Sequence, residues 1–145
     1  PQGNDRAQVK GIYEGVCDIA IINNYYFGKL KYSEDPVQRE WAKSMRLTFP
    51  NQGEGDRGAH INISGGGVAK HSKNKESAIK LLEFLSNSKS QKMYSEINFE
   101  YPVNVKVQPS EELVSWGNFR EDKISIEKIA QLSIDAQKII DRVGW

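Results

Sequence analysis

The sequence predicts an α/β protein, because segments with strand character alternate along the chain with segments of helical periodicity. Two strands are expected, one in the apolar run 18–28 and one over residues 59–69, where polar and apolar side chains alternate. The clearest helix follows residue 74. Its apolar face consists of Ala78, Leu81, Leu82 and Leu85.

The remaining elements follow from residues that begin and end helices. Asp5 is expected to cap a first helix that ends near Gly15, and Pro36 to begin a short helix over about 36–45. Residues 28–35 form a polar connection, and residues 51–58 form a loop by composition.

The carboxyl-terminal part of the chain is also predicted to be mainly helical. A short helix is expected over about 88–97, an extended segment at residues 101–104, and a last helix that ends at Gly144. The apolar stripe of that last helix consists of Ile129, Leu132, Ala136, Ile139, Ile140 and Val143.

Chain length, net charge and cysteine content exclude several classes of function. The chain has 145 residues, the size of one typical domain, and 38% of them are hydrophobic. The formal net charge is only +1, which offers no electrostatic footprint for nucleic acid or for an anionic membrane. Cys17 is the single cysteine, so an intrachain disulfide and a cysteine-based zinc or iron–sulfur site are excluded.

No motif of an enzyme is found. The glycines at 65–67 match neither a P-loop nor a dinucleotide fingerprint, and no serine stands in a nucleophile motif. His60 and His71 are not spaced as a helical metal pair. None of these residues forms a recognisable active site.

Two adjacent tyrosines, Tyr25 and Tyr26, close the apolar run. A turn at the end of a strand brings both phenols to one side, although neighbouring residues on a regular strand point to opposite faces. Two phenol oxygens suit a hard, highly charged metal ion. The alternative is that the pair serves packing, with each hydroxyl hydrogen-bonded.

The order of motifs along nearly the whole chain resembles the periplasmic ferric-iron-binding proteins of ABC transporters, the FbpA/FutA-like group of class II periplasmic binding proteins. The motifs that carry the resemblance are Asn4-Asp5-Arg6-Ala7, Ile21-Ile22-Asn23-Asn24-Tyr25-Tyr26, Ile61-Asn62-Ile63-Ser64-Gly65-Gly66-Gly67, Asn74-Lys75-Glu76-Ser77-Ala78, Tyr101-Pro102-Val103-Asn104 and Asp141-Arg142-Val143-Gly144-Trp145.

The resemblance implies a periplasmic-binding-protein-like fold of type II, present in part, and a function in iron uptake. It implies that the phenolates of Tyr25 and Tyr26 bind Fe³⁺ in a cleft between two lobes, with or without a synergistic anion. It further implies a periplasmic or membrane-associated extracytoplasmic location, an ABC-type permease as partner, and no catalysis.

Members of this group are about twice as long, so the chain is expected to be the carboxyl-terminal half. Residues 1–58 are then expected in the second lobe, and residues 59–101 in the hinge crossover and the first lobe. Residues 102–145 are expected to return to the second lobe. Further ligands would lie upstream of Pro1. The partner would be the missing amino-terminal half or a self-associated copy.

Two other functions stay open at this point. The same fold binds organic or anionic solutes such as thiamine, polyamines, phosphonates or sugars, and the tyrosines would then contact the solute. The second alternative is an interaction module without a ligand.

Overall fold

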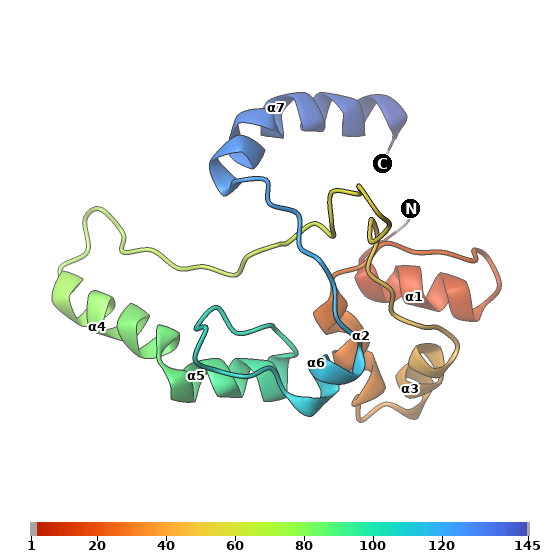
Figure 1. Ribbon diagram of the computed structural model, residues 1–145, viewed down its shortest axis with the longest axis horizontal. Coiled ribbons are helices and arrows are strands. Elements are labelled where there is room, and N and C mark those ends of the chain that lie inside the picture. The colour runs from red at the N-terminus through yellow and green to blue at the C-terminus, as the bar shows by residue number, and fades with distance from the viewer. Residues whose placement is uncertain (1–2, 145) are drawn as a thin grey trace. The chain divides into compact units, whose positions relative to one another are not determined.

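The computed structural model describes residues 3–144, and its regular structure is helical (Figure 1). The elements are α1 (Asp5–Tyr13), α2 (Asn24–Lys31), α3 (Pro36–Lys43), α4 (Lys75–Ser86), α5 (Ser88–Met93), the π-helical turn η1 (Tyr94–Asn98), α6 (Glu111–Ser115) and α7 (Ile126–Val143). The chain divides into two compact units. Of the described residues, one unit contains 3–48 and 62–118, and the other contains 49–61 and 119–144.

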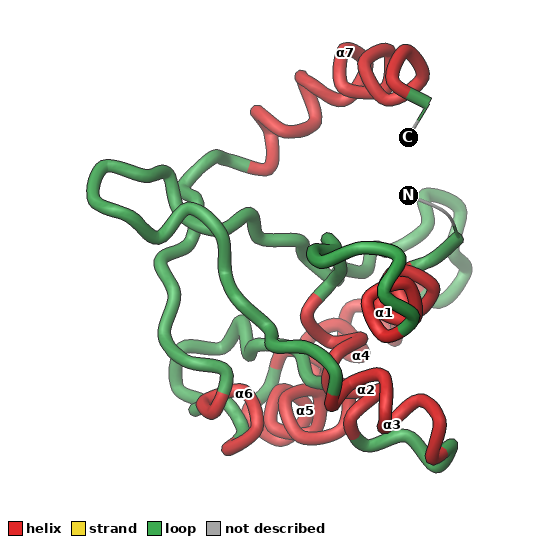
Figure 2. The backbone as a smooth tube through the Cα atoms, turned by 90° about the vertical axis from the view of Figure 1, so that its right-hand side faces the viewer, coloured by secondary structure: helices red, strands yellow, loops and turns green. Residues whose placement is uncertain are grey.

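The strands expected over 18–28 and 59–69 are not formed, so the β part of the predicted α/β class is missing from residues 3–144. Figure 2 shows helices and loops, and the strand-type pairing within these residues is one isolated parallel bridge between Ala59 and Glu121. Residues 19–23 carry no regular structure, and the chain enters α2 at Asn24. A strand needs a neighbour for its backbone hydrogen bonds, and the described residues supply none here.

The core of the larger unit lies between its first three helices. Val9 of α1, Leu30 of α2 and Ala42 of α3 are buried together. Partly buried side chains pack around them, namely Ile22, Phe27, Trp41 and Met45. Full burial of a leucine such as Leu30 stabilises the fold by roughly 1.5–3 kcal/mol. This packing fixes α2, which the sequence had predicted as a strand end followed by a polar connection.

Local capping explains where the other helices begin. Asn4, rather than the expected Asp5, caps α1, since its side chain accepts a hydrogen bond from the Ala7 N–H at 3.1 Å. Asp35 caps α3 at the Val37 N–H, and Pro36 occupies the first turn as predicted. Ser125 caps α7 in the same way, and Gly144 ends that helix in the left-handed conformation, as predicted.

The helix expected over 88–97 consists of two parts. Asn87 caps α5, and the wider turn η1 follows and ends at Phe99, whose backbone is left-handed (φ 58°). The short helix α6 was not predicted. Its signal in the sequence is Ser110 followed by two glutamates, which is typical of a capped helix start.

The smaller unit is organised by Arg120. Its guanidinium Nη2 donates to the carbonyl oxygens of Asn51, Gly53 and Asp56 at 3.3, 2.8 and 2.9 Å. One side chain thus satisfies three carbonyls of the loop that composition predicted at 51–58. The Phe49 and Phe119 rings stack beside it with centroids 4.2 Å apart.

Two helices present several apolar side chains to solvent. Helix α7 has no buried residue, and Leu132, Ile139 and Val143 of its predicted stripe are exposed. Helix α4 has none either, and Leu81 and Phe84 are exposed. Exposed stripes of this kind are typical of surfaces that another polypeptide covers.

Among residues 3–144, no helix is both long and apolar enough to cross a lipid bilayer.

Candidate metal site

Helix α2 carries both tyrosines in its first turn, instead of the turn after a strand that the sequence predicted. Asn23 is the last extended residue (ψ 132°), and Tyr25 and Tyr26 are the second and third residues of the helix. The isoleucines before the helix differ in burial. Ile22 packs on the core, whereas Ile19 and Ile21 are exposed. The position of the phenols is therefore set by the core contacts of α2 and not by a sheet edge.

The two phenol rings lie next to each other. Their centroids are 4.4 Å apart with an interplanar angle of 32°, and both residues are half-buried. Consecutive helical residues do not ordinarily face each other, so this contact needs a rotamer choice that turns the rings together. Neither ring is sealed in the core, since both residues stay partly exposed.

The hydroxyls interact as well as the rings. The pKa of Tyr25 is raised from 10.0 to about 12, first by hydrogen bonding with Tyr26, then by burial, and then by the nearby charges of Tyr26, Asp5 and Glu100. Without a cation, Tyr25 is therefore neutral at physiological pH. The ammonium of Lys29 lies 5.0 Å from the centre of the Tyr25 ring and favours the electron-rich face.

The start of α2 is held by residues from other parts of the chain. The Asp5 carboxylate accepts hydrogen bonds from the backbone N–H of Asn23 at 2.7 Å and from its Nδ2 at 3.2 Å. The Nδ2 of Asn24 donates to the Phe99 carbonyl at 3.5 Å. The phenols also stand at the positive end of the α2 dipole, which favours negative charge on them.

The far side of α2 packs against aromatic rings through a close approach at Gly28. Phe99 is buried and stacks on the Tyr32 ring, with centroids 5.4 Å apart. The Trp116 ring lies near both Phe27 and Phe99, with centroid distances of 5.9 Å and 6.4 Å. A Cβ at Gly28 would stand only 2.6 Å from Phe99 Cδ2, so the absence of a side chain allows this contact.

Glu112 of α6 anchors the end of α2. Its carboxylate accepts hydrogen bonds from Lys31 Nζ at 2.7 Å, from the Tyr32 hydroxyl at 2.7 Å and from Trp116 Nε1 at 2.8 Å. Burial pushes the pKa of Glu112 upward, but the hydrogen bonds from these three donors outweigh it and hold the pKa below its ordinary 4.5. The same contact raises the pKa of Tyr32.

Replacement Glu112→Gln is expected to lower the free energy of unfolding by about 2 kcal/mol at neutral pH, because hydrogen bonds to a charged group are lost. A carboxylate with a lowered folded pKa stabilises the fold above its ordinary pKa, and this stabilisation is lost as the pH falls through the folded pKa. Urea unfolding should therefore show a difference between the two proteins that shrinks in acid below pH 4.5.

The matched control is Glu111→Gln, which changes the exposed neighbouring residue in the same turn of α6. It is expected to change stability by at most about 0.5 kcal/mol. A Glu112→Gln difference that persists unchanged in acid would contradict the role of the carboxylate charge.

The other residues weighed from the sequence do not join the tyrosines. Within residues 3–144, no three His, Cys, Asp or Glu side chains gather in a way that would hold a metal ion. His60 and His71 are both exposed. Two phenols alone leave most positions around a trivalent cation open, so the described residues form only part of a coordination sphere.

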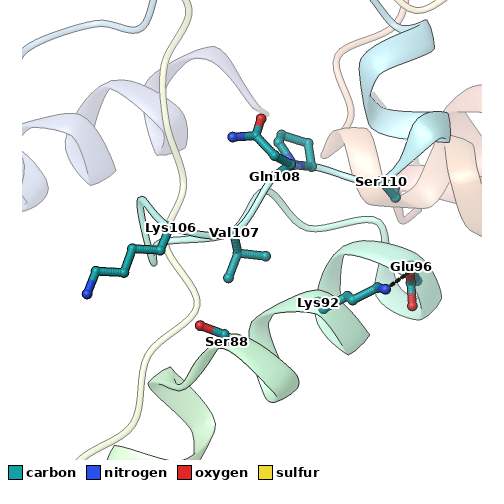
Figure 3. A pocket seen from close by; sticks show the side chains of 8 residues that line it. Ser88, Lys92, Glu96, Lys106, Val107, Gln108 and Ser110 are labelled. Carbon is teal, nitrogen blue, oxygen red and sulfur yellow. Dashed lines mark ion pairs between the residues drawn. The ribbon is translucent and has the colours of Figure 1, made fainter.

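A shallow cavity of about 390 Å³ lies elsewhere in the larger unit (Figure 3). Its lining residues are Ser88, Lys92, Glu96, Lys106, Val107, Gln108, Pro109 and Ser110. Lys92 pairs with Glu96 at 3.7 Å, and Lys106 adds a second cation. Neither tyrosine lines this cavity, and two ammonium groups make it unsuitable for a cation.

Comparison with known proteins gives a consistent set of relatives. Iron uptake protein A1 of Synechocystis is 41% identical over 145 residues, which are 100% of this chain and 40% of that protein. A solved ferric binding protein from Campylobacter jejuni is 40% identical with a TM-score of 0.92, over 99% of this chain and 45% of the other. The Trichodesmium protein IdiA (FutA), solved with iron and citrate ligands, is 45% identical with a TM-score of 0.90. This match covers 100% of this chain and 45% of the other.

The chain thus spans less than half the length of each of these three proteins. The model of one protein family, described as bacterial extracellular solute-binding protein, matches residues 24–121. That match covers more than half of the chain and includes α2 with both tyrosines. The chain belongs to the family of bacterial extracellular solute-binding proteins.

Proposed function

We propose that the chain binds ferric iron through the phenolates of Tyr25 and Tyr26 and takes part in iron uptake. The observation that carries this proposal is the pair of phenol rings 4.4 Å apart at the start of α2. The relatives add support, because they are an iron uptake protein and ferric binding proteins. Solute-binding proteins are not enzymes, which supports binding rather than catalysis as the role.

The chemistry of the pair fits a trivalent cation. Fe³⁺ is a hard acid and phenolate is a hard, anionic oxygen donor. The cation itself provides the driving force for loss of the phenol protons. To bind Tyr25 as a phenolate, the metal must displace its phenol proton, which the raised pKa holds tightly.

The complete protein is proposed to have two lobes of the type II periplasmic-binding-protein fold, with iron between them. Residues 1–58 and 102–145 would belong to the second lobe and residues 59–101 to the crossover and the first lobe. The exposed faces of α4 and α7 support a partner polypeptide, either the remaining half of the protein or a second copy. That polypeptide would supply the other iron ligands and the strands that pair with residues 19–23.

The complete protein would work outside the cytoplasm, in the periplasm, and would deliver its iron to an ABC-type permease. The family name supports an extracytoplasmic location. Reversible capture is sufficient for this role, and a synergistic anion would fill coordination positions that the protein leaves open.

Iron binding is expected to release protons. Tyr25, with its pKa raised to about 12, is protonated before binding, so ligation as a phenolate releases its proton. Affinity for Fe³⁺ should therefore rise with pH near neutrality. Calorimetric titration in buffers of different ionisation enthalpy measures the number of protons, and a value of zero would contradict phenolate ligation.

The test of the proposed function is a titration of the complete two-lobe protein with ferric citrate, followed by visible absorption. A charge-transfer band from phenolate to Fe³⁺ that saturates at one iron per protein is the expected result. A protein that stays colourless and instead retains an organic solute would assign the site to that solute.

A further inference from the structure

Asp5 makes a contact that its own helix does not require. It stands in the first turn of α1, but Asn4 performs the capping of that helix. The Asp5 carboxylate instead reaches Asn23, which is 18 residues further along the chain, and accepts both its backbone N–H and its side-chain Nδ2. Because the start of α1 is already satisfied, this contact serves the start of α2 rather than that of α1.

The side chain of Asn23 is held from both ends. Its Nδ2 donates to Asp5 at 3.2 Å, and its Oδ1 accepts from Nδ2 of Asn62 at 3.2 Å. The backbone carbonyl of Asn23 accepts the Tyr26 N–H at 3.1 Å. A continuous series of hydrogen bonds thus runs from Asp5 and Asn62 through Asn23 to the backbone of the phenol pair, and it fixes where the first turn of α2 begins.

The same carboxylate places a negative charge near the phenols. Its carboxylate is hydrogen-bonded to Asn23, only two residues before Tyr25 in the chain. Coulomb attraction is proportional to the charge of the cation, so a fixed anion favours a trivalent over a divalent ion. The Asp5 Oδ1 is held by its two hydrogen bonds to Asn23, so the carboxylate has a fixed position beside the start of α2.

We propose that Asp5 is a positioning residue for the iron site, which orients Tyr25 and Tyr26 through Asn23 and adds negative charge that favours Fe³⁺. This inference rests on the proposed function of the tyrosine pair. The corresponding role in metalloproteins is that of an outer-sphere partner, whose loss typically costs ten- to a hundredfold in metal affinity.

Two substitutions in the complete protein separate position from charge. Asp5→Asn keeps an oxygen that accepts from the Asn23 N–H but removes the charge. It is expected to lower Fe³⁺ affinity about tenfold while the charge-transfer band keeps its wavelength. Asp5→Ala removes both contributions, so affinity should fall further and the band should shift as the phenols change orientation.

The matched control is Asp35→Ala, which removes an aspartate that caps α3, a helix without a phenol pair. It is expected to lower stability while affinity and band stay unchanged. If Asp5→Ala does not fold, Asn62→Ala removes the other hydrogen bond to the Asn23 side chain and should shift the band with little loss of affinity.

An Asp5→Ala protein with unaltered affinity and band, or an Asp35→Ala protein with the same changes, would overturn the role of Asp5. If Asp5→Ala does not fold, an Asp5→Asn protein with unaltered Fe³⁺ affinity would overturn it. These outcomes leave the proposed function intact when the unaltered protein has the band and the Tyr25→Phe/Tyr26→Phe protein lacks it. If the unaltered protein has no band, the proposed function and the inference fail together.

Discussion

A protein with both Tyr25 and Tyr26 replaced by phenylalanine is expected to lose its visible colour with iron and at least a hundredfold in Fe³⁺ affinity. The reason is that both anionic ligands are removed, whereas loss of an outer-sphere partner alone typically costs ten- to a hundredfold. The rings keep their contact in this variant, because phenylalanine preserves the aromatic surfaces that lie 4.4 Å apart. Equilibrium competition with citrate, followed by absorption, measures the loss.

The control for this pair is Tyr13→Phe, since Tyr13 is an exposed tyrosine at the end of α1. Its removal should leave affinity and colour unchanged. Circular dichroism should show the same helix content in all three proteins. Retention of the band by the double variant would assign the colour to other tyrosines and remove the proposed role of the pair.

The second large effect is expected at Gly28. Replacement by alanine places a methyl group 2.6 Å from Phe99 Cδ2, and the stack of Phe99 on Tyr32 leaves that ring no room to retreat. Overpacking of this kind costs about 1–3 kcal/mol, which exceeds the gain of about 1 kcal/mol in helix propensity. Because the Phe99 carbonyl also holds Asn24, iron affinity should fall as well.

The matched control is Gly11→Ala, a helical glycine in α1. The nearest atom to its new Cβ is Sγ of Cys17 at 3.5 Å, an ordinary contact. This variant should be stabilised by up to about 1 kcal/mol. Urea unfolding distinguishes the two cases, and a Gly28→Ala protein as stable as Gly11→Ala would show that Phe99 does not pack on α2 as described.

Local signals predicted most of the helices. Caps and proline determine the starts of α1, α3 and α7, and apolar spacing predicts α4. These signals depend on residues within one or two turns, so they can be read from sequence. Helix α2 was missed because its tyrosines and Gly28 are poor helix formers, and the packing of Leu30 against Val9 and Ala42 outweighs that preference.

The two expected strands could not be predicted reliably from local signals. The alternation in residues 59–69 is genuine, but a strand forms only when a neighbour accepts and donates its backbone hydrogen bonds, and residues 3–144 provide one isolated bridge. No local pattern shows whether such a neighbour is present.

The tyrosine pair could be singled out from the sequence, whereas the residues around it could not. Tyr25 and Tyr26 are adjacent in sequence, and the family resemblance draws attention to them. Their support is not local, because Asp5 and Asn62 stand 18 and 39 residues from Asn23 along the chain. The role of Glu112 was hidden likewise, since 81 residues separate it from Lys31.

The most direct measurement is X-ray diffraction from crystals of the iron-loaded complete protein, with data collected at the iron absorption edge. We expect one anomalous peak within bonding distance of both the Tyr25 and the Tyr26 hydroxyl oxygens, and Asp5 still hydrogen-bonded to Asn23. An iron peak away from this pair, or an organic molecule between the two rings without an anomalous peak, would contradict ferric-iron binding by the phenolates.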